Sequence, residues 1–204
     1  MRILFVRHGE SQANLHHEIS NRGLRYGLTR TGRLQALALA QKLQGRPIMK
    51  IYSSSLLRTI ETSVILAERL EVDYEISEAL REYDCGNLEG RADVEAWQSW
   101  HKLFDDWLVQ HHWDEKIEGG ESFYDIRKRF EPFVAKLIEC NAGTENEVVC
   151  VAHGGLYWLM LPVVLRNVNP EFISKYGFDY STCIVAEQKE NGLFSIDWNG
   201  KSID

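Results

Sequence analysis

Three segments of the sequence combine histidine, arginine or glycine directly after short apolar runs. They are Arg7-His8-Gly9-Glu10-Ser11, Ser53-Ser54-Ser55-Leu56-Leu57-Arg58 and His153-Gly154-Gly155. An arginine guanidinium group is permanently charged and presents a planar fork of donors that matches phosphate oxygens. Two histidines are poor partners for each other unless an anion lies between them. These residue types together predict a phosphate pocket that contains a nucleophile.

Glycines in the same segments fit this pocket. Gly9 leaves room for a close approach of the backbone. Gly154 and Gly155 open a predicted helix, whose first N–H groups and dipole attract an anion. Gly154 is therefore a predicted substrate-binding residue.

The apolar runs themselves predict the scaffold. Residues 3–6, 48–52 and 148–152 are typical of strands buried on both faces. Between them lie two helical patterns: one is expected behind Thr29 or Thr31, either of which could cap it, and the other covers residues 57–67. This alternation predicts an α/β three-layer sandwich, with a mostly parallel central sheet and helices on both faces. Ligands bind at the carboxyl ends of such strands, where Arg7, His8, Arg58 and His153 would meet.

The rest of the chain departs from this alternation. Residues from about 92 to 140 contain no convincing strand, and we expect a helical insertion at about 83–120, above the carboxyl ends of the strands. A second helix would begin at a capping box formed by Ser122 and Asp125. Near the end, Asn191-Gly192 separates two apolar runs and predicts a β-hairpin with a type I′ turn. No repeat or linker interrupts the chain, so one domain is expected over residues 1–204.

Composition limits the classes of partner. The net charge is −7, from 23 basic and 30 acidic side chains, which disfavours nucleic acids and anionic membranes. No apolar run is long enough to cross a membrane, and the N-terminal run is too short for a signal peptide. The cysteines follow no disulfide or metal pattern, so we expect free thiols and a cytoplasmic location; they are Cys85, Cys140, Cys150 and Cys183.

The three segments and several additional motifs occur in a fixed order along the chain. They are Arg7-His8-Gly9-Glu10 with Asn14, Ser53-x-x-Leu56-x-Arg58-Thr59-x-Glu61-Thr62, Leu80-Arg81-Glu82 with Gly86 and Leu88-Glu89-Gly90, Gly120-Glu121-Ser122, and His153-Gly154-Gly155. Each motif alone is weak. The ordered set, which runs from residue 2 to about 160, resembles the phosphoglycerate-mutase-like branch of the histidine phosphatase superfamily.

The resemblance implies a role for each matching residue. His8 would attack phosphorus and become phosphohistidine, while Arg7, Arg58 and His153 would bind the equatorial oxygens. Asn14 would donate to the phosphate, and Ser20 falls where relatives often place a small polar substrate contact. Glu82 would protonate the leaving oxygen and later activate water. The family needs no metal and no dissociable cofactor for hydrolysis, and it releases inorganic phosphate.

Several of these residues also have plainer interpretations. His8 could be a buried structural histidine, and His153 a helix cap. Arg58 could form an ion pair with Glu61 or Glu82. Glu82 has acidic neighbours that could act in its place, namely Glu78, Asp84 and Glu89.

The other histidines and the tryptophans raise separate questions. His16-His17 and His111-His112 lack ligand spacing, so we expect exposed or rim histidines and no metal site. One face of the insertion helix carries Trp97, Trp100, Phe104 and Trp107. This face could be simple packing, or part of it could line the substrate entrance.

The predicted function is hydrolysis of a small phosphorylated metabolite, a phosphate ester. A phosphoglycerate mutase uses the same catalytic core, but relatives with that activity carry extra basic residues where this chain has only Arg91, Lys102 and Lys116 between residues 91 and 116. A phosphate-binding or protein-binding module on an inactive scaffold is the third alternative. It would be expected if a catalytic residue were replaced, and none is. The sequence identifies neither the leaving group nor the oligomeric state.

Overall fold

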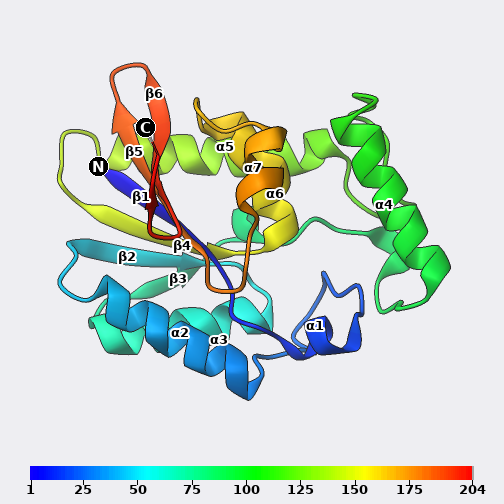
Figure 1. The fold of residues 1–204 in the computed structure, drawn as a ribbon, viewed down its shortest axis with the longest axis horizontal. Helices are drawn as coiled ribbons and strands as arrows, with labels where there is room; N and C mark the ends of the chain where they lie inside the picture. Colours follow the sequence, from blue (N-terminus) through cyan, green and yellow to red (C-terminus); the bar gives the residue numbers. More distant parts are fainter. Residues whose placement is uncertain (204) are drawn as a thin grey trace.

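The computed structural model describes residues 1–203 and places a seven-stranded sheet between two layers of helices (Figure 1). The strand order is β3-β2-β4-β1-β5-β6-β7. The strands are β1 (Arg2–Arg7), β2 (Ile48–Ser53), β3 (Tyr74–Ile76), β4 (Glu147–Ala152), β5 (Cys183–Lys189), β6 (Gly192–Trp198) and β7 (Lys201–Ser202). The strands from β3 to β1 are parallel to one another, and β5 to β7 extend the sheet in antiparallel fashion. The predicted α/β fold with a parallel centre and a C-terminal hairpin is confirmed.

Helices cover both faces of the sheet, as predicted (Figure 1). On one face lie α2 (Arg30–Leu43) and α3 (Leu57–Leu70). On the other face lie α5 (Phe123–Cys140), α6 (Gly154–Val164) and α7 (Pro170–Tyr176). The remaining helices are α1 (Gln12–His16), α4 (Val94–Leu108) and two 3₁₀ turns, Glu78–Leu80 and Gly86–Leu88.

The apolar runs form strands because both faces of the central sheet are buried. In β1, Ile3 and Phe5 pack into the hydrophobic core beneath α5 and α6, whereas Leu4 and Val6 pack into the core beneath α2 and α3. All four side chains are fully buried. Alternate side chains point to opposite faces of a strand, so a strand covered on both sides must be apolar throughout.

Two helix starts occur where capping residues predicted them. The Thr29 hydroxyl accepts a hydrogen bond from the Gly32 N–H at 3.0 Å, so Thr29, rather than Thr31, caps α2. The capping box of Ser122 and Asp125 starts α5. These contacts satisfy N–H groups that have no partner within the helix.

The C-terminal hairpin forms, but its predicted type I′ turn at Asn191-Gly192 is wrong. Lys189 pairs with Gly192, so the two residues of the turn are Glu190 and Asn191. Neither has the positive φ that a type I′ turn requires at both positions. Gly192 instead begins β6 with a φ of +131°. The glycine therefore supplies its unusual conformation one position after the turn.

The helical insertion lies beyond the carboxyl ends of the parallel strands (Figure 1). Its helix α4 begins at Asp93, whose carboxylate accepts the Ala96 N–H at 3.0 Å. No strand occurs between residues 92 and 140, as predicted. Within residues 1–203, no helix has the length and apolar composition needed to cross a membrane.

Candidate active site

The three sequence segments meet at the carboxyl ends of β1, β2 and β4. Arg7 ends β1 and His8 follows it, Arg58 lies in the first turn of α3 after β2, and His153 is the N-cap of α6 after β4. The His8 N–H donates to the Ala152 carbonyl at 3.0 Å, so the β1–β4 pairing holds His8 at the sheet edge. A cavity of about 690 Å³ opens here, lined by Arg7, His8, Asn14, Ser20, Arg58, Glu82 and Gly154 among others.

Both ring nitrogens of His8 have defined partners. Its Nδ1 lies 2.6 Å from the Gly9 carbonyl oxygen, which can only accept, so Nδ1 carries the proton. Its Nε2 accepts a hydrogen bond from Arg58 Nε at 3.1 Å and therefore holds the lone pair. Burial lowers the pKa of His8 well below its ordinary value, and the charges of Arg58 and Arg7 lower it further. The imidazole is neutral at pH 7, which is the state a nucleophile needs.

The turn after β1 depends on Gly9. A Cβ at this position would collide with the backbone of Gly32 in the first turn of α2. The Gly9 N–H donates to the Thr62 hydroxyl at 3.3 Å. The close approach expected of this glycine is therefore present, and it fixes the carbonyl that orients His8.

The Arg58 side chain donates a hydrogen bond to His8 and forms no ion pair with Glu61 or Glu82. It is 6% exposed and donates from Nη2 to the Ser20 carbonyl at 2.9 Å. Glu61, the suggested partner, instead binds Arg33 and the Leu28 N–H. Burial lowers the pKa of Arg58 to about 10, so the side chain remains a cation at neutral pH. Ser20 thus positions Arg58 through its backbone, in addition to lining the cavity.

Arg7 provides the second fixed cation. One of its terminal nitrogens donates to the Phe178 carbonyl, and the guanidinium lies 4.4 Å from the centre of the Tyr180 ring. The Arg7 Nε is buried and has no hydrogen-bond partner in the protein. A buried donor without a partner is costly, and an anion bound beside it would satisfy it.

His153 is fully buried beside His8, with the ring centres 5.2 Å apart. Its Nε2 lies 2.8 Å from the Ser54 hydroxyl, and its Nδ1 is buried without a partner. Burial lowers the pKa of His153 well below its ordinary value, with a further contribution from Arg58. When the serine hydroxyl donates to Nε2, the neutral ring carries its proton on Nδ1, and this buried N–H has no acceptor in the protein.

Of the four acidic residues that the sequence left as candidates, Glu82 is the one that lines the cavity. It is 9% exposed, and burial raises the pKa of its carboxyl group. Its oxygens accept the N–H groups of Gly155 at 3.1 Å and Tyr83 at 3.2 Å. A Cβ on Gly155 would lie 2.9 Å from a Glu82 oxygen, so this glycine permits the approach. The N-terminus of α6, which we expected to attract the phosphate, therefore binds the Glu82 carboxylate at Gly155, while Gly154 lines the cavity.

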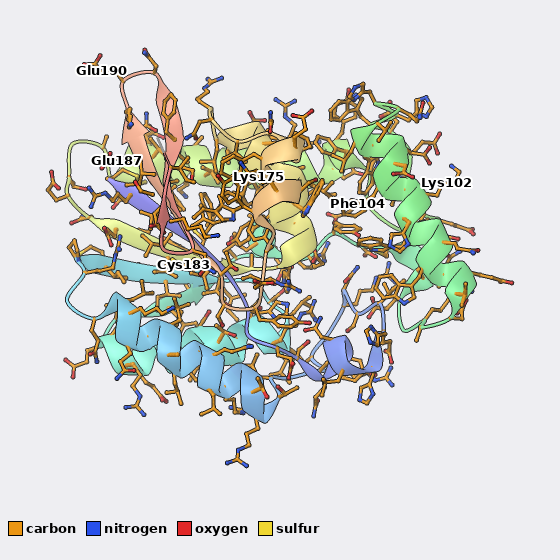
Figure 2. All side chains as sticks on the ribbon, in the orientation of Figure 1. Lys102, Phe104, Lys175, Cys183, Glu187 and Glu190 are labelled. Carbon is orange, nitrogen blue, oxygen red and sulfur yellow. The ribbon has the colours of Figure 1, made fainter. Side chains whose placement is uncertain are left out.

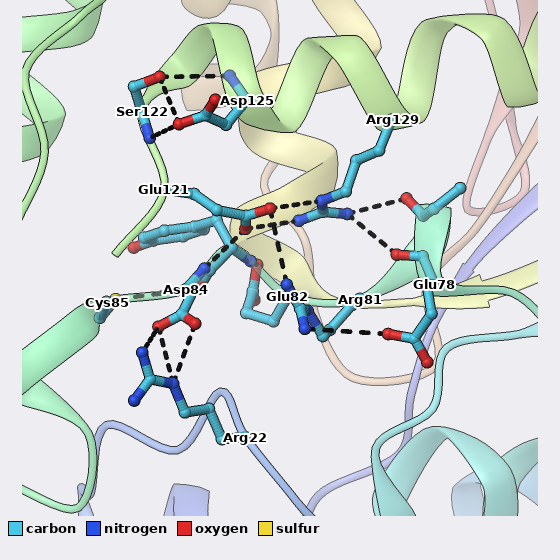
Figure 3. A network of polar contacts seen from close by, with 12 residues as sticks. Arg22, Glu78, Arg81, Glu82, Asp84, Cys85, Glu121, Ser122, Asp125 and Arg129 are labelled. Atoms are coloured by element: carbon cyan, nitrogen blue, oxygen red, sulfur yellow. Dashed lines mark hydrogen bonds and ion pairs between the residues drawn. The ribbon is translucent and has the colours of Figure 1, made fainter. Parts of the chain in front are cut away.

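Two of the alternative acids, Glu78 and Asp84, belong to a network of polar contacts around Glu82 (Figure 3), whereas Glu89 accepts the N–H groups of Asn21 and Arg22. Asp84 forms an ion pair with Arg22, and its N–H donates to Glu121 at 2.9 Å. Glu121 in turn accepts two hydrogen bonds from Arg129, at 2.8 and 3.0 Å. Glu121 belongs to the Gly120-Glu121-Ser122 motif, and the sequence alone indicates no role for it. In the structure, Glu121 links the backbone of Asp84, two residues after Glu82, to the side chain of Arg129.

The side-chain amide of Asn14 is oriented by Ser11. Its side-chain oxygen accepts from the Ser11 N–H at 3.0 Å and from the Ser11 hydroxyl at 2.7 Å. These bonds orient the amide so that its NH₂ group is the part available to a ligand in the cavity, which Asn14 lines.

The aromatic face of α4 has both roles that the sequence left open: part of it lines the cavity and part packs in the core. Trp97, Trp100 and Phe104 line the cavity, whereas Trp107 is fully buried in the core. Figure 2 shows Phe104 projecting from α4 toward α6, with Lys102 on the outward side of the same helix. Trp158 of α6 also lines the cavity, and its position in an apolar helix gave no signal of this.

The paired histidines lie elsewhere. His16, His17, His111 and His112 are exposed and do not line the cavity. Among residues 1–203, no group of three or more histidine, cysteine or acidic side chains is arranged to hold a metal ion. The four cysteines are free thiols, as predicted.

A family model of the histidine phosphatase superfamily, branch 1, matches residues 3–201. The chain belongs to the histidine phosphatase superfamily. The resemblance carried by the ordered motifs is therefore confirmed. The match spans both the catalytic segments and the insertion.

Two curated proteins and one solved structure that are similar to this chain carry different names within the superfamily. Glucosyl-3-phosphoglycerate phosphatase of Mycobacterium tuberculosis is 33% identical over 173 residues, which are 81% of this chain and 75% of that protein. A probable phosphoglycerate mutase of Salmonella choleraesuis is 31% identical over 157 residues, 76% of this chain and 70% of that protein. The structure of a mycobacterial glucosyl-3-phosphoglycerate phosphatase in complex with VO₃ has a TM-score of 0.81 at 26% identity, covering 97% of this chain and 98% of the other.

Proposed function

We propose that this histidine phosphatase hydrolyses a small phosphorylated metabolite, a phosphomonoester, through a phosphohistidine formed on His8. One observation carries the proposal. A neutral imidazole presents the lone pair of Nε2 at a cavity, held by the Gly9 carbonyl on one side and by Arg58 on the other. This arrangement would have no purpose in a histidine that merely fills the core.

In the first step, His8 Nε2 attacks phosphorus while the bond from phosphorus to the ester oxygen breaks. Charge in the loose transition state is spread over the three equatorial oxygens, so fixed donors supply most of the stabilisation. Arg7, Arg58 and His153 are these donors, and Asn14 adds its amide. Glu82 gives its proton to the departing oxygen, which leaves as an alcohol. Burial raises the pKa of its carboxyl group, which favours the protonated form that this step needs.

In the second step, water replaces the alcohol. The Glu82 carboxylate takes a proton from water as the oxygen attacks phosphorus, and the bond from phosphorus to His8 Nε2 breaks. Inorganic phosphate leaves, His8 is neutral again and Glu82 is protonated again. The same residues therefore serve both steps, with Glu82 acting first as acid and then as base.

Labelled water tests this proposal against mutase activity. Hydrolysis of an aryl phosphate in H₂¹⁸O should place one ¹⁸O atom in each phosphate released. A mutase would instead interconvert 3-phosphoglycerate and its 2-isomer in the presence of a primer bisphosphate, with little release of phosphate. An inactive binding module would do neither, and either of these results would contradict the proposal.

We expect turnover that is indifferent to chelators and inhibited by vanadate. The cavity gathers cations and neutral donors, and vanadate adopts the trigonal-bipyramidal shape of the transition state, so it should bind more tightly than phosphate. The measurement is the initial rate with excess EDTA, and the inhibition constants of vanadate and phosphate. Activity lost with EDTA and restored by Zn²⁺ or Mg²⁺ would contradict the metal-free mechanism.

The wider setting is also inferred. We propose that residues 1–204 form one domain, because the site draws on segments from residue 7 to residue 155. Four free thiols fit a reducing compartment such as the cytoplasm. The net charge of −7 disfavours nucleic acid as a partner.

A further inference from the structure

The outer part of the cavity has an aromatic wall, formed by Trp97, Trp100, Phe104 and Trp158. Trp100 and Phe104 are stacked with ring centres 4.3 Å apart. Trp97 meets Trp100 edge-on at 5.5 Å, and Trp158 meets Phe104 edge-on at 6.2 Å. The indole N–H of Trp97 donates to the His17 carbonyl at 2.9 Å, which fixes the wall to the segment after α1. The wall is thus held in place by contacts within the protein.

This wall begins where the leaving group must lie. Tyr83 follows Glu82, and its ring lies 5.7 Å from Phe104 and 6.3 Å from Trp100. Glu82 is the acid proposed to protonate the ester oxygen. The atoms beyond that oxygen therefore meet the aromatic wall rather than the arginines.

The charges that line the cavity are separated by depth. Among the residues described, Arg7 and Arg58 are the only lysine or arginine side chains in the lining, and both belong to the phosphate site. The outer lining carries two carboxylates, Glu18 and Asp105. Glu18 forms an ion pair with Arg25 at 3.0 Å and accepts a hydrogen bond from the Tyr26 hydroxyl at 2.6 Å. Asp105 is exposed and forms no ion pair within residues 1–203.

Basic side chains on the segments that flank the lining residues form ion pairs with acids. The pairs are Arg22 with Asp84, Arg25 with Glu18, Arg91 with Asp93, and Lys102 with Asp106. A second anionic group on a ligand would therefore meet aromatic rings, the His101 imidazole and the Asp105 carboxylate, because no lysine or arginine among residues 1–203 lines the cavity outside the phosphate site. An anion placed there would lose part of its hydration without a lysine or arginine to replace it, and Asp105 would repel it.

We infer that the phosphoryl group is the only anionic group of the substrate, and that its alcohol carries an aromatic or apolar ring that packs on Trp100. The inference rests on the proposed phosphatase function and narrows its substrate class. Esters with a carboxylate or a second phosphate near the ester oxygen, such as 3-phosphoglycerate, fall outside it. Rings gain from packing on an aromatic face, and an uncharged ring loses little on leaving water.

A matched pair of substrates tests the charge requirement. 3-Carbamoylphenyl phosphate and 3-carboxyphenyl phosphate have nearly the same shape, and the second adds one negative charge. The kcat/KM of the carbamoyl ester should exceed that of the carboxy ester by about tenfold. In Asp105→Lys the ratio should fall severalfold. Asp114→Lys is the control, because Asp114 is exposed and does not line the cavity, and it should leave the ratio unchanged.

A second pair tests the ring. Trp100→Ala should lower kcat/KM for phenyl phosphate about tenfold more than for ethyl phosphate, which has no ring to pack. Trp113→Ala removes an indole outside the cavity and should change both esters alike. Trp100→Leu repeats the test with a side chain that keeps apolar volume, in case the alanine variant folds poorly.

The outcomes separate this inference from the proposed function. Equal kcat/KM values for the carbamoyl and carboxy esters, or equal losses for phenyl and ethyl phosphate in both Trp100 variants, would overturn the inference while the phosphatase function stands. Failure of the unaltered protein to hydrolyse any of the four esters would instead overturn the proposed function.

Discussion

Replacing His8 with alanine is expected to reduce hydrolysis of an aryl phosphate by at least about 10,000-fold, because no other side chain can accept the phosphoryl group. The variant should remain folded. The substitution removes the acceptor of the hydrogen bond from Arg58 Nε. A buried donor left without a partner lowers the free energy of unfolding by about 1–3 kcal/mol. Steady-state rates and thermal melting followed by circular dichroism measure the two effects.

His111→Ala is the matched control for this variant. His111 is exposed and lies outside the cavity, so its removal should leave both rate and melting temperature near those of the unaltered protein. A His8→Ala variant that hydrolysed the ester at the normal rate would remove His8 from the mechanism. An unfolded His8→Ala variant would call for His8→Gln, which keeps most of the side-chain volume.

Replacing Glu82 with glutamine is expected to slow hydrolysis of an alkyl phosphate by about 100- to 10,000-fold, the usual contribution of a general acid. The loss should be much smaller for 4-nitrophenyl phosphate, because its leaving group departs without a proton. The glutamine amide retains an oxygen that can accept the Gly155 N–H, so the contact at the start of α6 can persist in this variant. The measurement is kcat for the two esters in single-turnover and steady-state experiments.

The pH dependence of the hydrolysis rate distinguishes an acid role of Glu82 from a structural role. Glu82 must be protonated to act as an acid, so the first step should fail as pH rises above its raised pKa. His8 must be neutral, so the step should fail as pH falls below its lowered pKa. Glu82→Gln should remove the alkaline limb for alkyl esters and leave the acid limb. Equal losses for both esters at every pH would mean that Glu82 is structural.

The sequence was most informative where one physical requirement dominated. Strands covered on both faces must be apolar, and parallel strands end at one edge, so the meeting of His8, Arg58 and His153 could be predicted from their positions alone. The capping box of Ser122 and Asp125 was similarly local. Such features depend on neighbours in sequence or on burial, both of which leave a pattern in the residues.

Features that depend on packing between distant segments were missed or misplaced. The strand β3 is short and exposed at every residue, so it has no apolar signal. The N-terminus of α6 could attract any anion, and only the folded chain brings Glu82 to Gly155. Trp158 lines the cavity because α4 lies opposite it, which helical spacing within α6 could not indicate.

The proposed mechanism requires a phosphohistidine on His8, and rapid quenching detects this intermediate. The protein is mixed with a ³²P-labelled aryl phosphate, quenched in alkali within milliseconds and digested for mass spectrometry. We predict an acid-labile, alkali-stable label on His8, attached at Nε2 because Nδ1 is occupied by the Gly9 carbonyl. The label should form and decay at rates that account for turnover. Full hydrolytic activity with no label on His8, or with label on His153 instead, would contradict the account.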